Sequence, residues 1–137
     1  MSNECVFCKI VAGQIPSSAV LETEDALAFL DIGPLAPGHT LLIPKNHYER
    51  VSEMPGEEAG RVLSALPKLC QAVAQATGAE GFNVFQTNGE CAGQVVPHVH
   101  FHIIPRNPND GLGFRWKPGK YVGGEMEAMQ EKIKSAL

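Results

Sequence analysis

The sequence predicts an α+β domain in which helices pack on an antiparallel sheet. Two observations carry this prediction. Short apolar segments follow one another across brief turns, which favours antiparallel pairing, and two longer stretches have helical periodicity. A chain of 137 residues favours a single domain over residues 1–137, and a hydrophobic content of 44% is enough for a core.

The first part of the chain predicts a short helix and three strands. Residues 5–13 predict one or two helical turns ended by Gly13, a residue that readily takes the left-handed conformation at a helix end. Strands are expected next at residues 19–22, 26–32 and 39–44. The segment 33–38 is rich in glycine and proline and predicts a rigid loop, and Pro44 is expected to stop the third strand.

A long amphipathic helix is predicted over residues 57–77. Its apolar residues recur at a spacing of three and four, so one face of the helix is suited to packing on the sheet. Pro67 interrupts this pattern and predicts a kink or a division near Ala65 and Leu66. Gly78 is the expected stop.

The last part of the chain predicts two more strands and a C-terminal helix. A strand at 81–86 leads into a loop at 87–97, and the next strand is expected to begin at His98. A polar loop follows at 107–113, and the periodicity of residues 125–137 predicts the C-terminal helix.

Composition narrows the class of protein. The formal net charge of −4 argues against a nucleic-acid-binding surface, and no apolar run approaches the ~20 residues of a membrane span, so we expect neither partner. The N-terminus lacks a basic stretch followed by an apolar one, which indicates no signal peptide. Four cysteines are too few for a disulfide scaffold. We therefore expect a cytoplasmic protein with reduced thiols.

Three of the five histidines, His98, His100 and His102, occupy alternate positions in one apolar segment. Side chains alternate across a strand, so the three imidazoles would share one face while Val99 and Phe101 enter the core. This row of three histidines (His98, His100 and His102) allows three interpretations. It could be a polar strand face, a three-histidine metal site, or a site of phosphate chemistry with a histidine nucleophile.

The loop before this row contains groups suited to a ligand. Gly93 would allow close approach of the backbone, whose N–H groups can bind phosphate oxygens. Gln94 and Asn88 add neutral hydrogen-bonding groups for a leaving group or a ribose. Each signal is weak alone, and Gly93 is equally well explained as a turn residue.

The segment from Asn88 to Arg106, with its run His-Val-His-Phe-His-Ile-Ile, resembles the signature of the histidine-triad (HIT) family. The likeness extends from Cys5 to about Trp116. It is closest to the small bacterial HIT hydrolases that carry an N-terminal Cys-x-x-Cys. Further matching segments are Cys5–Ile10, Phe29–Ile32, Pro37–Lys45 and His47.

This resemblance implies a HIT-like fold that forms homodimers, with the sheet continued across the interface and the segment from about residue 107 extending toward the partner or the substrate. It implies cleavage or transfer of a nucleoside monophosphate from a phosphoanhydride or phosphoramidate. The expected ligand is a purine nucleotide such as AMP or a dinucleoside polyphosphate.

The family's roles transfer to individual residues of this chain. The position of His100 matches the nucleophile that forms a nucleotidyl-histidine intermediate, and His102 matches the residue that contacts the phosphate. The implied nucleotide-binding residues are Asp31, Ile32, Asn88, Gly93, Gln94, Val95, His100 and His102. Val95 departs from the family pattern, because many relatives have serine or threonine there beside the leaving group.

The pair Cys5 and Cys8 allows three interpretations. The expected compartment disfavours a disulfide, and the setting lacks the βαβ pattern of a thioredoxin-like redox pair. A tetrahedral zinc site would need two further ligands, for which His47 and His98 are available. In the HIT branch with these cysteines the matching positions bind zinc. Four protein ligands leave no open position, so this zinc would be structural.

Three hypotheses about function follow. The first is a nucleotidyl hydrolase or transferase that acts through His100. The second is a nucleotide-binding or scaffolding module with vestigial catalysis. The third is a zinc hydrolase whose metal is held by the row of three histidines.

Overall fold

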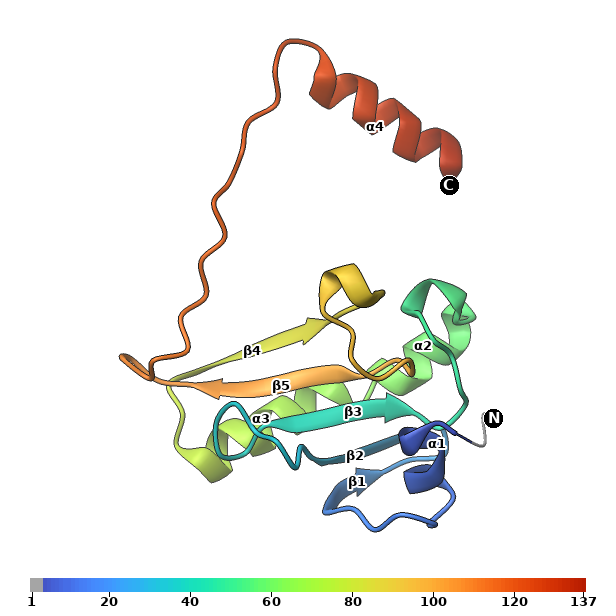
Figure 1. The fold of residues 1–137 in the computed structure, drawn as a ribbon, viewed down its shortest axis with the longest axis vertical. Coiled ribbons are helices and arrows are strands. Elements are labelled where there is room, and N and C mark those ends of the chain that lie inside the picture. The colour runs from blue at the N-terminus through green and yellow to red at the C-terminus, as the bar shows by residue number, and fades with distance from the viewer. Residues whose placement is uncertain (1–3) are drawn as a thin grey trace.

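The structure is a computed structural model that describes residues 4–137, and it confirms the α+β class. Its 5-stranded antiparallel sheet has the order β1-β2-β3-β5-β4 (Figure 1). The strands are β1 (Ala19–Glu22), β2 (Ala26–Leu30), β3 (Thr40–Pro44), β4 (Gly81–Gln86) and β5 (Phe101–Arg106). The helices are α1 (Val6–Val11), α2 (Gly56–Leu63), α3 (Leu66–Thr77) and α4 (Glu125–Ala136).

The sheet separates two apolar clusters, because successive side chains of a strand point to opposite faces. In β2, Ala26 and Ala28 belong to the cluster that contains the buried residues of α2 and α3. Leu27 and Phe29 belong to the cluster on the opposite face, beneath α1. The sheet therefore has one face covered by α2 and α3 and a second face on which α1 packs.

The predicted division of the long helix is confirmed. The first helix, α2, ends at Leu63, and α3 begins at Leu66 with Pro67 in its first turn. A proline is tolerated there because the backbone N–H groups of a first turn have no partner within the helix. Gly78 ends α3 in the left-handed conformation, with φ of 67°.

The strand that carries the histidines begins later than predicted, at Phe101 rather than at His98. The segment before Phe101 forms other hydrogen bonds, one from its backbone and one from the His98 side chain. The Val99 N–H donates to the carbonyl of Tyr48 (2.8 Å), and the carbonyl of Pro44 accepts a bond from the His98 ring (2.9 Å). The predicted alternation nevertheless holds, since Val99 and Phe101 are buried in the core.

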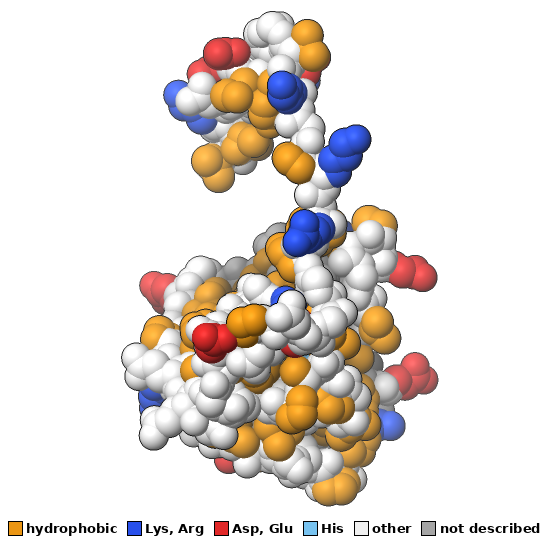
Figure 2. Space-filling view, turned by 90° about the vertical axis from the view of Figure 1, so that its left-hand side faces the viewer, with side chains coloured by type: hydrophobic (Ala, Val, Ile, Leu, Met, Phe, Trp, Pro, Cys, Tyr) orange, Lys and Arg blue, Asp and Glu red, His pale blue; other side chains and the backbone are white. Residues whose placement is uncertain are grey.

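The predicted C-terminal helix is present as α4, but unlike α2 and α3 it does not pack on the sheet. No residue of α4 is buried, and the helix stands apart from the sheet at the end of an extended segment over residues 107–124 (Figure 1). The space-filling view shows it as a separate lobe joined to the body by a narrow stalk (Figure 2). Large apolar side chains are exposed on this arm: Phe114, Trp116, Tyr121, Val122, Met126, Met129 and Ile133.

The structure also shows how buried the other two cysteines are and whether any helix could span a membrane. Cys70 is buried in the core cluster beneath α3, whereas Cys91 is exposed. Within residues 4–137, every helix is too short or too polar to cross a membrane.

Candidate active site and metal centre

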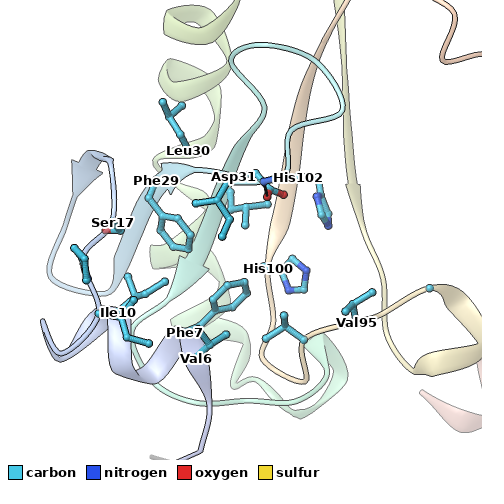
Figure 3. Close-up of a pocket in the computed structure, with 17 residues that line it drawn as sticks. Val6, Phe7, Ile10, Ser17, Phe29, Leu30, Asp31, Val95, His100 and His102 are labelled. Atoms are coloured by element: carbon cyan, nitrogen blue, oxygen red, sulfur yellow. Dashed lines mark hydrogen bonds between the residues drawn. The ribbon is translucent and has the colours of Figure 1, made fainter.

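A cavity of about 510 Å³ opens on the α1 face of the sheet. Phe7 from α1 and Phe29 from β2 form an apolar wall, and His100 and His102 lie on the other side (Figure 3). Asp31, which follows β2 directly, stands near His102. The cavity thus combines a large apolar surface with a few convergent polar groups, as small-molecule sites generally do.

Six of the eight residues expected to bind nucleotide line this cavity: Asp31, Ile32, Gly93, Val95, His100 and His102. Asn88 and Gln94 are not among its lining residues. Asn88 Oδ1 accepts the Val51 N–H (2.8 Å), and Gln94 joins the Gly89 N–H to the Glu49 carbonyl, both at 2.7 Å. These two side chains therefore hold the loop that precedes the histidines.

The tautomer of His100 follows from one hydrogen bond. His100 Nδ1 lies 2.7 Å from the backbone carbonyl of His98. A carbonyl oxygen only accepts, so Nδ1 carries the proton and donates it. In the neutral ring Nε2 then keeps its lone pair free, which is the state that a nucleophilic histidine requires.

The tautomer of His102 follows from a chain of two hydrogen bonds. The Leu35 N–H donates to His39 Nδ1 (3.1 Å), so the neutral His39 ring carries its proton on Nε2. His39 Nε2 lies 2.9 Å from His102 Nδ1 and donates to it. Because His102 Nδ1 accepts, its Nε2 carries a proton and can donate to an anionic ligand. The structure thus joins His39, at the start of the third strand segment, to His102.

Burial keeps these imidazoles neutral at pH 7. Desolvation is the main cause that lowers the pKa of His100 and of His39 from the ordinary value of 6.5. Desolvation, with smaller contributions from His100 and His39, lowers the pKa of His102 to about 4. His102 also stacks on Phe85 with 4.5 Å between ring centroids, which fixes its plane.

Phe7 is a site residue that the sequence interpretation missed. It lies between the two cysteines and contacts His100 edge-on with 5.1 Å between ring centroids. An aromatic residue inside a Cys-x-x-Cys pair gave no signal of its own, because the pattern concerns the cysteines alone. The fold brings Phe7 to the cavity by packing α1 across the sheet.

A second group of side chains, Cys5, Cys8, His47 and His98, lies beside the cavity with all ligand atoms within 4.8 Å of one another. Three of the separations are Cys5 Sγ–His98 Nδ1 at 3.4 Å, Cys8 Sγ–His47 Nδ1 at 3.3 Å and His47 Nδ1–His98 Nδ1 at 3.2 Å. Ligands at zinc–ligand distances of 2.0–2.3 Å in a tetrahedral site are about 3.3–3.8 Å apart, so the cluster has the dimensions of such a site.

The tautomer of His98 also suits a metal. Its Nε2 lies 2.9 Å from the Pro44 carbonyl and must donate to it, so Nδ1 presents a lone pair to the cluster. Among the described residues the row itself forms no three-histidine metal group, because His98 faces the cysteines while His100 and His102 face the cavity. This geometry disfavours the hypothesis of a zinc hydrolase built on the row.

Asp31, His39 and His102 form another group of potential ligands. The hydrogen bonds described above already place a proton on His39 Nε2. This nitrogen donates to His102 Nδ1 and lies 3.6 Å from Asp31 Oδ2. Asp31 Oδ1 accepts the Gly33 N–H at 2.9 Å. The group is thus explained as a hydrogen-bond network that orients His102.

Fold and site together define an α+β protein with an activated histidine in a cavity of ligand size, next to a closed Cys/His cluster. The chain belongs to the HIT family, because the HIT domain model matches residues 12–109.

Individual relatives agree with this assignment. The chain is 44% identical over 135 residues to the adenosine 5'-monophosphoramidase of Schizosaccharomyces pombe, a match that spans 97% of this chain and 98% of the relative. A crystal structure of a HIT family member from Bacillus subtilis superposes with a TM-score of 0.94 at 43% identity, over 98% of each chain. A zinc-bound histidine triad family protein from Mycobacterium smegmatis superposes with a TM-score of 0.75 at 34% identity, over 98% of each chain.

We expect the ring nitrogens to report these tautomers directly. At pH 7, long-range ¹H–¹⁵N spectra should show His100 protonated on Nδ1 and His102 protonated on Nε2. Because burial lowers the pKa of His102 to about 4, the ring should stay neutral down to pH 5, well below the ordinary midpoint of 6.5. A His102 that titrates near pH 6.5, or a His100 protonated on Nε2, would contradict the hydrogen-bond assignments.

Proposed function

We propose that this protein is a nucleotidyl hydrolase or transferase. It cleaves a nucleoside monophosphate from a phosphoramidate or a phosphoanhydride, through a nucleotidyl intermediate on His100. The observation that carries the proposal is the hydrogen bond from His100 Nδ1 to the His98 carbonyl, which leaves Nε2 as a nucleophile in the cavity. The high identity to an adenosine 5'-monophosphoramidase supports an adenosine phosphoramidate as one substrate.

In the first step, His100 Nε2 attacks the α-phosphorus. A phosphorus–nitrogen bond forms to the ring, and the bond from phosphorus to the leaving oxygen or amine breaks. His102 Nε2–H donates to a non-bridging phosphate oxygen and stabilises the developing charge. The leaving group takes a proton from solvent water, and the water that attacks in the second step returns one; Val95, which lines the cavity where many relatives have a hydroxyl residue, has no proton to supply.

In the second step, water attacks the phosphorus, the bond to His100 breaks, and the nucleoside monophosphate is released. Neutral His100 is regenerated, so the two steps sum to hydrolysis of one bond. An acceptor other than water in this step would make the reaction a transfer. Two displacements of moderate barrier replace one difficult displacement.

The apolar part of the cavity is suited to a purine nucleoside. Phe7, Phe29 and Ile10 offer flat and aliphatic surface to a base, while Asp31 is placed to accept hydrogen bonds from ribose hydroxyls next to Ile32. AMP or the adenosine end of a dinucleoside polyphosphate is the expected ligand.

His100→Ala should lower kcat/KM for adenosine phosphoramidate by about 10⁴-fold or more, as expected for loss of a nucleophile. The variant should keep the circular dichroism spectrum of the parent and still bind AMP, because the apolar wall is intact. Cys91→Ser, at an exposed thiol, is the control and should retain activity.

Wild-type turnover in the His100→Ala variant would contradict the assignment of the nucleophile. A wild-type protein that binds AMP but turns over neither phosphoramidates nor dinucleoside polyphosphates would favour the alternative, a nucleotide-binding or scaffolding module with vestigial catalysis.

We also infer that the cluster of Cys5, Cys8, His47 and His98 holds a structural zinc ion. The dimensions of the cluster, the lone pair of His98 Nδ1 and the zinc-bound relative support this inference. Zinc bound by four protein ligands has no open position and would supply cross-linking of the chain rather than chemistry to the reaction.

Cys8→Ser should reduce the bound zinc from one equivalent to a small fraction, measured by plasma mass spectrometry after gel filtration. Loss of the cross-link should lower Tm by about 5–10 °C, which corresponds to roughly 2–3 kcal/mol for a chain of this size. Cys91→Ser is the matched control and should keep both zinc and Tm. Equal zinc contents in the two variants would refute the assigned ligands.

We further infer that the protein is a homodimer and that the arm from about residue 107 reaches the partner or the substrate side. The exposed apolar residues of α4 support this inference, since a lone chain would leave them in water. The edge strand β4, with Phe82 and Val84 exposed, is available to continue the sheet across the interface.

The variant Met129→Glu with Ile133→Glu should shift the protein from dimer to monomer in sedimentation velocity at micromolar concentration. The control, Ala128→Glu with Ser135→Glu, adds the same charge to the opposite face of α4 and should remain dimeric. A wild-type protein that sediments as a monomer would contradict the inference.

A further inference from the structure

Three parts of the chain connect the cluster of Cys5, Cys8, His47 and His98 to the nucleotide cavity. We propose that the metal state of the Cys5, Cys8, His47 and His98 cluster controls the competence of the nucleotide site. In this view, loss of the ion misplaces His100 and loosens the cavity wall while the sheet stays folded. The proposal rests on the zinc site and the nucleotide site proposed above.

The first link is His98 itself. Its side chain enters the cluster, with Nδ1 3.4 Å from Cys5 Sγ, and its own backbone carbonyl is the acceptor for His100 Nδ1 at 2.7 Å. The β5 ladder begins only at Phe101, so His98 lies outside the paired part of the strand. Its backbone is held by the bonds from the His98 N–H to the Val96 carbonyl and from the Val99 N–H to the Tyr48 carbonyl, both at 2.8 Å, and its ring by the Pro44 carbonyl. Metal ligation at Nδ1 would add a further restraint on the carbonyl that orients the nucleophile.

The second link is Phe7. Phe7 lies inside the tetrapeptide Cys5–Cys8, and both end residues of this tetrapeptide belong to the cluster. The ring of Phe7 contacts His98 at 5.8 Å, His100 at 5.1 Å and Phe29 at 5.6 Å between centroids. One metal ion would thus fix a wall of the cavity and, through it, one face of the nucleophile.

The length of α1 makes this anchoring important. The helix spans 6 residues, Val6–Val11, and a helix so short is not stable by its own hydrogen bonds. Its N-terminal end lies at Cys5, whose side chain accepts the Cys8 N–H. Metal ligation at Cys5 and Cys8 would hold the turn that presents Val6 and Phe7 to the cavity.

The third link runs through the segment that carries His47. The carbonyl of Tyr48 accepts the N–H of Val99, which lies between His98 and His100, at 2.8 Å. The carbonyl of Glu49 accepts a bond from Gln94, which in turn holds the loop before the row. Displacement of His47 would therefore reach the catalytic segment by a route independent of Phe7.

Without an ion, hydrogen bonds alone hold the cluster together. Neutral His47 protonated on Nδ1 can donate to His98 Nδ1 at 3.2 Å, and the two thiols supply only weak hydrogen bonds to the rings. Because these bonds are weaker than metal–ligand bonds, the four side chains would be freer to shift, and the His98 carbonyl and Phe7 would shift with them.

The test compares zinc-loaded protein with protein stripped by a chelator under reducing conditions, with metal content measured by plasma mass spectrometry. We expect far-UV circular dichroism to change little. AMP affinity, measured by calorimetry, should fall at least tenfold, and the ¹⁵N shifts of the His100 ring should move away from the Nδ1–H pattern. Adding one equivalent of zinc should restore both. Cys91→Ser, treated identically, should behave as the wild type.

Equal AMP affinity and unchanged His100 shifts in the folded, zinc-free protein would overturn the proposal. If removal of zinc unfolds the chain, the zinc-loaded protein is compared with cadmium-loaded protein instead. The cadmium ion is larger than zinc, so it should move the four ligands apart without removing the metal. The proposal then requires AMP affinities that differ at least threefold and distinct His100 shifts, and identical values overturn it.

The two underlying assignments fail in recognisable ways. A protein that binds no stoichiometric metal overturns the zinc site and this proposal together. A protein that binds metal but not AMP overturns the nucleotide site, while the His100 shifts still decide whether the metal state reaches the nucleophile.

Discussion

The hydrogen bond from His100 Nδ1 to the carbonyl of His98 is the interaction on which the site depends. It selects the tautomer that leaves Nε2 free, and it turns that nitrogen toward the cavity. Burial lowers the pKa of the ring and so keeps it neutral at pH 7, as the proposed attack requires. A charged ring would have no lone pair, and the other tautomer would present a proton instead of a nucleophile. Two other histidines support this arrangement: His39 orients His102, the proposed phosphate contact, and His98 supplies the acceptor for His100 Nδ1.

The three histidines of the row therefore have three different tasks. Strand geometry places them at alternate positions, but the hydrogen-bond partner of each ring decides its role. His98 donates from Nε2 to Pro44 and turns Nδ1 to the cysteines, whereas His102 accepts at Nδ1 and donates from Nε2. His100 lies between them and contacts Phe7. One segment can thus carry the proposed metal ligand and the proposed catalytic pair, because the two nitrogens of each imidazole can take different partners.

Sequence periodicity was sufficient for the α+β class, the division of the long helix at Pro67 and the burial of Val99 and Phe101, because these depend on local spacing and backbone chemistry. The start of β5 was not predictable, since it depends on where Tyr48 and Pro44 direct their carbonyls. The place of Phe7 in the cavity and the bond from His39 to His102 are long-range contacts that no local pattern encodes. The periodicity of α4 predicted a helix but not its packing partner, and only the family resemblance pointed to an extension from about residue 107.

The central claim, covalent chemistry at His100, is tested most directly by mass spectrometry of protein quenched during turnover of an adenosine phosphoramidate. The account predicts an adenylyl group on the peptide that contains His98, His100 and His102, with fragmentation that places it on His100. It also predicts that the adduct disappears as substrate is exhausted. An adduct confined to another residue, or rapid turnover with no adduct at any time, would contradict the account.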